Sequence, residues 1–273
     1  MSRTPFFVSL HHSIRLDENL PAIGLWDEQA ENLIRRATGV LLPKYFSPVR
    51  YRRVAALARA HFPRYGARYA YRGKASQIGL FRSLGFPHPR TSLFASPVDA
   101  AESLVTSGLP RRLPFVLKSD LGGGGSNVYP IRTKQEYEEG LSRLPAGERV
   151  LVQDWVDCGG MDLRVVLMAD QERSYFRVGG ESFYNNVSKG ARIEPDIHPE
   201  RQRAGIDLAK DLAERAGIDL AAFDVVFPRQ GQPQLLEINF LFGKKGLGGL
   251  PGYAQLFKRA VAGWKSRLLS AAG

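Results

Sequence analysis

The sequence predicts a mixed protein of the α/β or α+β class, and three observations support this prediction. Segments with the patterns of strands and helices alternate near the N-terminus. Long amphipathic segments with helical spacing recur in the rest of the chain. Several strand-like segments are separated only by short turns, as the members of antiparallel pairs are. The chain has 273 residues, enough to bury a sizeable core in one large domain or two smaller ones.

The N-terminal section is predicted to be a small unit of βαβα type. Residues 6–10 have the composition of a strand, residues 27–37 that of a helix, and residues 40–43 that of a short buried strand. Residues 51–61 carry apolar side chains at helical spacing, and Pro63 is expected to end that helix.

The middle of the chain is predicted to continue with helices and strands. A helix at residues 74–84, ended by Gly85, is followed by an extended segment at residues 87–93 and a strand at residues 114–119. Four consecutive glycines, residues 122–125, come next. They are followed by a strand at residues 127–131, a helix at residues 133–144 and a strand at residues 150–156. Thr133 and Glu136 match the capping-box pattern at the start of the second helix.

The C-terminal part is predicted to contain two antiparallel strand pairs and two long helices. The pairs are residues 162–168 with 174–178 and residues 223–227 with 234–240, and the helices are residues 199–216, closed by Gly217, and residues 253–269.

The charge of the chain favours anionic partners. Its formal net charge is +11, from 38 Lys and Arg against 27 Asp and Glu, which suits nucleotides, carboxylates, acidic proteins or nucleic acid. Basic residues concentrate between residues 50 and 90, interleaved with aromatic ones. Such a segment is either a solvated basic face or, as the less favoured alternative, a nucleic-acid-binding surface.

The sequence favours a cytoplasmic protein. Its single cysteine, Cys158, excludes an internal disulfide, as is usual in a reducing compartment. No apolar run approaches the roughly 18 residues that a membrane helix needs, so no membrane partner is expected. The apolar patch near the N-terminus is too short for a secretory signal.

The glycine run lies in the segment KSDLGGGGSNVY, residues 118–129. Neither the P-loop nor the dinucleotide-binding pattern fits it, and both of those place a helix after the glycines, whereas a strand is predicted here. Backbone N–H groups of such a loop can still form a nest for phosphate, and Lys118 would add a positive charge. The alternative is an ordinary long hairpin turn.

The hairpin at residues 223–240 carries a cluster of oxygen ligands. If Gln230 and Gly231 form its turn, Asp224 lies directly opposite Glu237, and Asn239 points to the same side as Glu237, away from Leu236. Two facing carboxylates repel each other, and a hard divalent cation such as Mg²⁺ would reverse that interaction. The alternative is a solvated polar face of an edge hairpin.

Other catalytic patterns find little support. The histidines are scattered without the H-E-x-x-H spacing, no G-x-S-x-G segment exists, and Cys158 has no histidine nearby in sequence. The glycine loop and the carboxylate hairpin are therefore the two features that a function has to connect.

Taken in order, these features resemble the ATP-grasp superfamily, in particular its branch with ribosomal-protein glutamate ligase and glutathione synthetase. The resemblance runs from Lys74 to the end of the chain. The segments that carry it are GKASQIGLFRSLGFPHPRT, PFVLKSDLGGGGSNVY, VLVQDWV, MDLRVVLM, YNNVSKGAR, FDVV and LLEINFLFG. Their order is more specific than any one of them.

The resemblance implies an ATP site with a bound cation. Lys74 and Lys118 match the two phosphate-binding lysines, and the glycines match a mobile flap over the phosphates. The other positions that match nucleotide-binding residues are Gly123, Gly124, Gly125, Ser126, Gln153, Asp154, Trp155, Val156, Asp162 (on the ribose side) and Asn186. Asp224, Glu237 and Asn239 match the ligands of Mg²⁺, for which Mn²⁺ can substitute.

The sequence departs from the family on the substrate side. Tyr184 stands where the family usually has an arginine that steadies the acyl phosphate, and Arg177, Lys189 and Arg192 are the candidates to supply that charge. Phe242 replaces a usual proline, and the N-terminal section is shorter than the domain that usually precedes the ATP-grasp fold.

The resemblance also implies a division of the chain and an activity. The expected parts are a short N-terminal α/β unit at residues 1–72, an N-subdomain with the flap at residues 73–152, and a C-subdomain with the metal hairpin at residues 153–273. The expected activity is that of an ATP-dependent ligase, which joins a carboxylate to an amine or thiol through an acyl phosphate and forms a C–N bond in the amine case. Small-molecule or peptide substrates are expected, and the basic charge of the chain favours anionic ones.

Two functions of other classes compete with this one. The first is a regulatory module that binds ATP without catalysis, which Tyr184 makes plausible. The second is a nucleic-acid-binding protein that uses the basic segment. Neither needs the three oxygen ligands at Asp224, Glu237 and Asn239.

Overall fold

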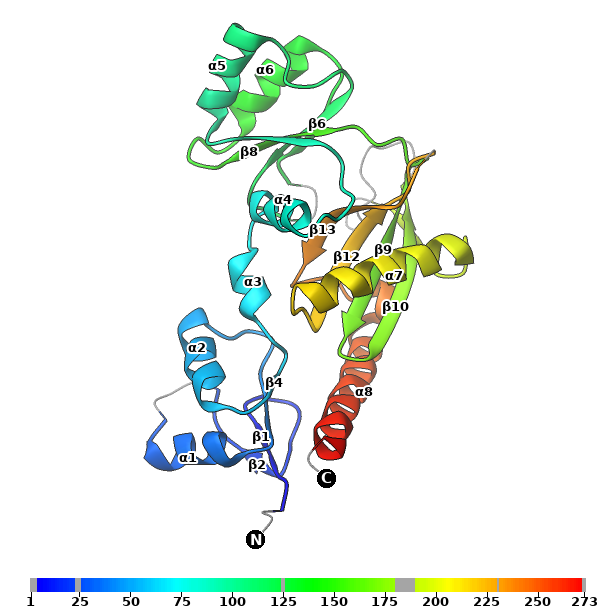
Figure 1. Cartoon of the computed structure of the whole chain (residues 1–273). Helices are drawn as coiled ribbons and strands as arrows, with labels where there is room; N and C mark the ends of the chain where they lie inside the picture. The colour runs from blue at the N-terminus through cyan, green and yellow to red at the C-terminus, as the bar shows by residue number, and fades with distance from the viewer. Residues whose placement is uncertain (1–3, 23–25, 124–125, 180–189, 230, 272–273) are drawn as a thin grey trace.

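The computed structural model describes residues 4–22, 26–123, 126–179, 190–229 and 231–271. Within them, the chain forms three β-sheets, which follow one another along the sequence (Figure 1). This confirms the predicted mixed class. No helix of the described residues is long and apolar enough to cross a membrane.

The N-terminal unit is a small parallel sheet with helices. Its strands lie in the order β2-β1-β3-β4, and all neighbouring pairs are parallel. The elements are β1 (Phe7–Ser9), β2 (Glu18–Asn19), α1 (Glu28–Arg36), β3 (Gly39–Leu41), α2 (Pro48–Leu57), β4 (His61–Phe62) and α3 (Gly66–Ala70).

One helix of this unit differs from its predicted position. The helix expected at residues 51–61 begins at Pro48 and ends at Leu57, and His61 lies in β4. The start is set by Ser47, whose side chain accepts a hydrogen bond from the backbone N–H of Arg50, and by the proline at the first helical position. The capping signal thus outweighs the apolar spacing.

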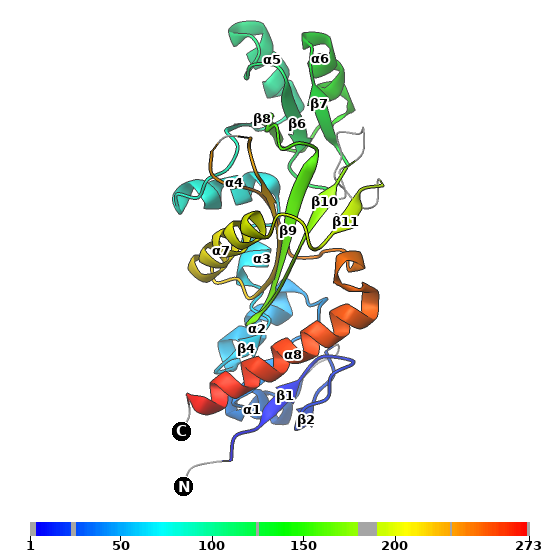
Figure 2. The same ribbon diagram turned by 90° about the vertical axis from the view of Figure 1, so that its right-hand side faces the viewer.

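The middle unit is an antiparallel sheet in the order β5-β8-β6-β7. Its elements are α4 (Lys74–Ser83), β5 (Thr91–Phe94), α5 (Pro97–Ser107), β6 (Phe115–Ser119), β7 (Val128–Ile131), α6 (Lys134–Arg143) and β8 (Val150–Asp154). The capping box of α6 is confirmed, with reciprocal bonds between Thr133 and Glu136. α5 and α6 lie side by side on one face of the sheet (Figures 1 and 2).

The C-terminal unit is built on a sheet in the order β11-β10-β9-β12-β13 with antiparallel pairs throughout. Its elements are β9 (Met161–Met168), β10 (Gln171–Val178), β11 (Arg192–Glu194), α7 (Pro199–Arg215), β12 (Leu220–Val226), β13 (Gln234–Asn239), a 3-10 turn (Lys245–Leu247) and α8 (Gly249–Ser270).

The two long helices cover opposite faces of the C-terminal sheet, as Figure 2 shows. Val165 of β9 points into the core formed with α7, whereas the next residue, Val166, points into the core formed with α8. α8 also packs on the N-terminal sheet, because its Trp264 contacts Phe7 and Phe62. α8 therefore packs against both the N-terminal and the C-terminal sheet.

α4 links the middle unit to the C-terminal sheet in the same way. The side chain of Gln77 donates to the carbonyl of Ile238 at 2.9 Å and accepts from its N–H at 2.8 Å. Phe81 of α4 is fully buried in the core that α7 shares. These contacts hold the start of α4 beside β13.

Candidate active site

The glycine run lies in the hairpin loop between β6 and β7. Lys118 pairs with Val128 across the two antiparallel strands, so a strand does follow the glycines. Gly124 and Gly125 lie outside the described residues. Gly122 has a φ of 110°, which favours glycine, and the N–H and hydroxyl of Ser126 both donate to the carbonyl of Gly123.

The base of this loop is tied to the start of α4 through Asp120. Gly73 at the helix start has no side chain to cap the helix, and Asp120 takes that role by accepting a hydrogen bond from the N–H of Ala75 at 2.7 Å. A Cβ at position 73 would lie 2.3 Å from an Asp120 carboxylate oxygen. Arg149 holds the other carboxylate oxygen at 2.9 Å.

This connection places Lys74 directly under the loop. Its backbone N–H donates to the carbonyl of Asp120, and its ammonium group donates to the carbonyl of Gly122 at 3.2 Å. The first predicted phosphate-binding lysine and the glycine loop are therefore neighbours in space, although they are far apart in sequence.

Lys118 is buried in the sheet beneath the loop. Its ammonium group donates to the side-chain oxygen of Gln153 at 2.6 Å, and Gln153 donates in turn to the hydroxyl of Thr91 at 3.0 Å. Burial lowers the pKa of Lys118 to about 8, with a further lowering by Lys74 that the nearby carboxylates oppose. Gln153 therefore orients the ammonium group of Lys118.

The carboxylate hairpin contains the facing pair that was predicted. Asp224 of β12 lies opposite Glu237 of β13. Strict alternation does not hold beyond this pair, because the register shifts between Asp224 and Val225, and Leu235 rather than Leu236 occupies the core beside Ile238. The simple alternation that set Leu236 opposite in direction to Glu237 and Asn239 is therefore interrupted, since the irregularity inserts a residue there.

Asp224 is surrounded by basic side chains. Arg164 of β9 binds both of its oxygens at 2.8 Å, Arg177 of β10 lies at 3.1 Å, and the amide of Asn239 donates to it at 3.0 Å. Burial alone would raise the pKa of Asp224, but the charges and hydrogen bonds of Arg164 and Arg177 hold it at about 2.

Arg177 bridges two aspartates. It binds Asp162 through two hydrogen bonds of 2.6 and 2.8 Å and reaches Asp224 on the other side. Burial raises the pKa of Asp162 to about 6, against the lowering effect of Arg177. Only 3% of Arg177 is exposed. Its described contacts are those of a buried ion-pair network.

Glu237 has very different surroundings from those of Asp224. Among the described residues it has no hydrogen-bond or ion-pair partner, and the charges that act on it include those of Lys74 and Lys118. Burial raises its pKa, as does the like charge of Asp224, while the two lysines lower it. Glu237 is therefore a carboxylate that faces the predicted phosphate-binding lysines without being bound by them.

The residues at the hairpin suit a hard divalent cation. Glu237 offers a carboxylate with no partner among the described residues, and Asn239 adds an amide oxygen, whereas the oxygens of the third predicted ligand, Asp224, are bound by Arg164 and Arg177. No group of three or more His, Cys, Asp or Glu side chains in the described ranges is arranged to hold a metal. A site here would thus rest on few protein ligands, as is common where Mg²⁺ also binds phosphate.

The remaining predicted residues have mixed positions. Asp154 forms an ion pair with Arg111 at 3.2 Å, and the guanidinium group of Arg132 lies over the ring of Trp155 at 6.0 Å from its centre. Arg192 is exposed at the start of β11, 3.9 Å from Glu194. Asn186 and Lys189, like Tyr184, fall in the segment 180–189, outside the described residues, so their predicted roles remain predictions.

Sequence reasoning missed two residues of the site. Arg164 lies opposite Asp224 in the register of β9 and β12, and its spacing of two from Asp162 would have placed both on one face of a strand. Asp120 directly precedes the glycine loop in sequence, but nothing in the sequence indicates that it caps α4.

The fold and the site together place a glycine loop with two lysines on one side and a carboxylate hairpin on the other. A family model described as the RimK-like ATP-grasp domain matches residues 71–248, which is more than half of the chain. The chain therefore belongs to the RimK-like ATP-grasp family. A search of curated proteins found no match.

Solved structures with this fold include several ATP-grasp enzymes. The RimK domain protein of Sphaerobacter thermophilus DSM 20745 is 16% identical, with a TM-score of 0.58, over 94% of this chain and 99% of that one. The VanG D-Ala:D-Ser ligase of Enterococcus faecalis is 14% identical, with a TM-score of 0.61, over 83% and 72%.

A third similar structure belongs to a longer protein. Carboxyaminoimidazole ribonucleotide synthase of Aspergillus clavatus, complexed with ATP, is 16% identical, with a TM-score of 0.54. The match covers 78% of this chain and 56% of that enzyme. At these identities the likeness shows the fold alone.

Proposed function

We propose that the protein is an ATP-dependent ligase that joins a carboxylate to an amine, or to a thiol, through an acyl phosphate. The observation that carries the proposal is the convergence of Lys74, Lys118 and Glu237 below the glycine loop. The two lysines supply positive charge for the phosphates of a nucleotide, and Glu237, which has no partner among the described residues, supplies a carboxylate for the magnesium ion that accompanies them.

The proposed reaction has two steps. In the first, an oxygen of the substrate carboxylate bonds to the γ-phosphorus of ATP as the bond to the bridging oxygen breaks, which releases ADP. In the second, the nitrogen of the amine bonds to the acyl carbon and loses a proton, and inorganic phosphate leaves. Phosphoryl transfer depends mainly on positioning and on neutralisation of charge.

The residues of the candidate site have separate roles in this scheme. Lys118, oriented by Gln153, and Lys74, held by Asp120, would bind phosphate oxygens. The glycine loop would cover them and keep water from the acyl phosphate. A divalent cation, Mg²⁺ or Mn²⁺, bound at Glu237 and its neighbours would neutralise further charge on the phosphates.

Similar structures support this chemistry. The ATP-grasp ligase PsnB, complexed with minimal precursor, Mg and ADP, is 20% identical, with a TM-score of 0.53, over 84% of this chain and 78% of that one. The VanG enzyme is named as a D-Ala:D-Ser ligase. C–N bond formation and small-molecule or peptide substrates are part of the proposal, and so is the cytoplasmic setting that the single cysteine favours.

An ATP-binding module without catalysis is the second candidate. Tyr184 replaces the expected arginine, and Arg177, one of its possible substitutes, is occupied by Asp162 and Asp224. The nucleic-acid alternative is weaker, because several arginines of the basic segment already bind partners within the chain, among them Arg53 with Glu31.

A screen for ADP release decides between a ligase and a regulatory module. Purified protein with Mg·ATP would be offered pools of carboxylic acids and amines, including amino acids, peptides and acidic proteins. A ligase releases ADP only when both an acid and an acceptor are present. A protein that ATP stabilises against heat, but that no pool induces to release ADP, would be the regulatory module instead.

A further inference from the structure

The N-terminal sheet has a ligand-binding geometry that the proposed ATP site does not use. In the order β2-β1-β3-β4, β2 lies on one side of β1, whereas β3 and β4 lie on the other side. The strand order therefore reverses between β1 and β3. In open parallel sheets, ligands bind beyond the carboxyl ends of the strands at such a point. Lys44 lies just beyond the carboxyl end of β3.

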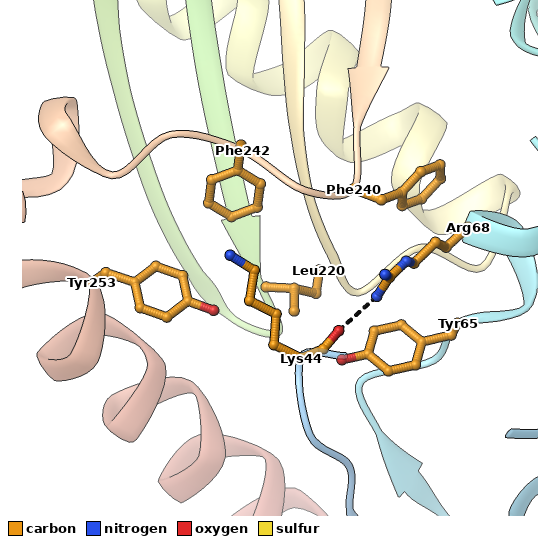
Figure 3. A pocket seen from close by; sticks show the side chains of 7 residues that line it. All are labelled: Lys44, Tyr65, Arg68, Leu220, Phe240, Phe242 and Tyr253. Atoms are coloured by element: carbon orange, nitrogen blue, oxygen red, sulfur yellow. Dashed lines mark hydrogen bonds between the residues drawn. The ribbon is translucent and has the colours of Figure 1, made fainter. Parts of the chain in front are cut away.

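A second lysine approaches Lys44 from a distant part of the chain. The ammonium groups of Lys44 and Lys244 lie 5.9 and 4.3 Å from the centre of the same ring, that of Tyr253 in α8. Figure 3 shows the Lys44 ammonium group pointing between Tyr253 and Phe242. Cation–aromatic contacts hold both lysines in place without neutralising them.

No acidic side chain of the described residues forms an ion pair with either lysine. The groups whose charges act on Lys244 are Lys44 and Tyr45, and burial, with Lys44 next, lowers the pKa of Lys244. Arg68 adds a third cation, and it donates to the carbonyl of Lys44 at 2.7 Å. By contrast, Arg64 in the same unit is paired with Asp219.

Two like charges held together in this way raise the free energy of the empty protein, and a bound anion would lower it. The space between the aromatic rings does not admit such a ligand, because the cavity beside Lys44 and Tyr253 measures about 10 Å³, room for a single water at most. An anion would therefore approach the ammonium groups from the solvent side.

The lysine pair adjoins the proposed active site. Lys244 follows the predicted metal ligand Asn239 by five positions, and the intervening Phe240 and Phe242 line the same small cavity as Lys44 (Figure 3). A molecule bound at the lysines would thus lie beyond the end of the carboxylate hairpin, on the side of the N-terminal unit.

We propose that Lys44 and Lys244 together recognise an anionic group, a carboxylate or a phosphate, on one of the two molecules that the enzyme joins. This inference rests on the proposed ligase function and adds a substrate class to it: a molecule with an anionic group besides the group that reacts. Lysine ammonium groups are compact point charges suited to either anion.

The test is a titration of the full-length protein, with lysines labelled by ¹³C-methylation, which keeps their charge. Glutarate, inorganic phosphate and neutral glutaramide serve as probes, each with and without Mg·ADP. We expect the signals of Lys44 and Lys244 to shift with saturation on addition of glutarate or phosphate, but not of glutaramide. Which anion binds more tightly distinguishes a carboxylate from a phosphate site.

Matched variants make the titration specific. Lys44→Gln and Lys244→Gln should each raise at least fivefold the anion concentration that half-saturates the shift at the other lysine. Lys245→Gln, which removes a charge next in sequence but outside the cluster, should have no effect. Shifts that do not saturate, that glutaramide reproduces or that Lys245→Gln reduces equally would overturn the proposal.

A parallel titration of the unmodified wild-type protein with Mg·ATP separates this inference from the function on which it rests. If Mg·ATP binds but neither anion shifts Lys44 and Lys244, the inference fails and the ligase proposal stands. If Mg·ATP does not bind at all, the ligase proposal fails, and with it the role of the lysines in substrate recognition.

Discussion

The two carboxylates that face each other across the hairpin differ in almost every respect. Asp224, on the side of β9 and β10, is bound by Arg164 and Arg177, and its pKa is held at about 2. Glu237, on the side of α4 and β6, has no such partner in the described structure, and burial raises its pKa.

This difference separates a structural role from a binding role. The charge of Asp224 is compensated within the fold, so its loss would leave the buried Arg164 without its ion-pair partner and Arg177 with Asp162 alone. The charge of Glu237 is not compensated by direct contact and faces Lys74 and Lys118. Glu237 is therefore the carboxylate that is available to a cation, and Asp224 is the one that holds the sheet together at the site.

The largest expected effect is that of Glu237→Gln on ATP turnover. If Glu237 holds the cation that neutralises the phosphates, the substitution should lower the rate of ADP formation by about 100-fold or more. Because burial raises the pKa of Glu237, its ionised form costs stability above the usual pKa of 4.5, so the melting temperature at pH 7 should not fall. Normal turnover by this variant would remove Glu237 from the site.

Asp224→Asn should have the opposite profile in stability. It breaks the buried pairs with Arg164 and Arg177, which should lower the free energy of unfolding by about 3 kcal/mol, measured in urea. Asp170→Asn is the matched control, because Asp170 pairs with Arg267 on the exposed surface, and a loss of less than about 1 kcal/mol is expected there. Equal losses in both variants would contradict the structural role of Asp224.

Lys118→Ala tests the lysine side of the comparison. Loss of a charged hydrogen bond to phosphate should weaken ATP binding about tenfold or more, as measured by calorimetry. Lys134→Ala removes an exposed lysine of α6 that pairs with Glu138 and should leave the affinity unchanged. If Lys118→Ala also leaves it unchanged, Lys118 does not contact the nucleotide.

A smaller effect is expected from pH. Burial lowers the pKa of Lys118 to about 8, so the free protein loses this positive charge as the pH rises through that value. The affinity for ATP should fall between pH 7 and pH 9 in the wild type, by a few-fold more than in Lys118→Ala. Parallel profiles in the two proteins would assign the pH dependence to another group.

The sequence predicted those features that depend on local pattern. The assumed turn at Gln230 and Gly231 placed Asp224 opposite Glu237, and the glycine run indicated a hairpin loop because a strand pattern follows it. The shift that brings Leu235 into the core, and the cap that Asp120 supplies to α4, depend on contacts between distant segments. The same holds for the meeting of Lys44 and Lys244 at Tyr253, to which the sequence offers no clue.

The central claim is that Glu237 and the lysines opposite it bind magnesium and ATP together. Calorimetric titration of ATP into the wild type and into Glu237→Gln, with Mg²⁺ or with EDTA, tests this most directly. The account predicts one ATP site in the wild type that Mg²⁺ strengthens, and loss of that strengthening in Glu237→Gln. An equal effect of Mg²⁺ in both proteins, or no ATP binding by the wild type, would contradict it.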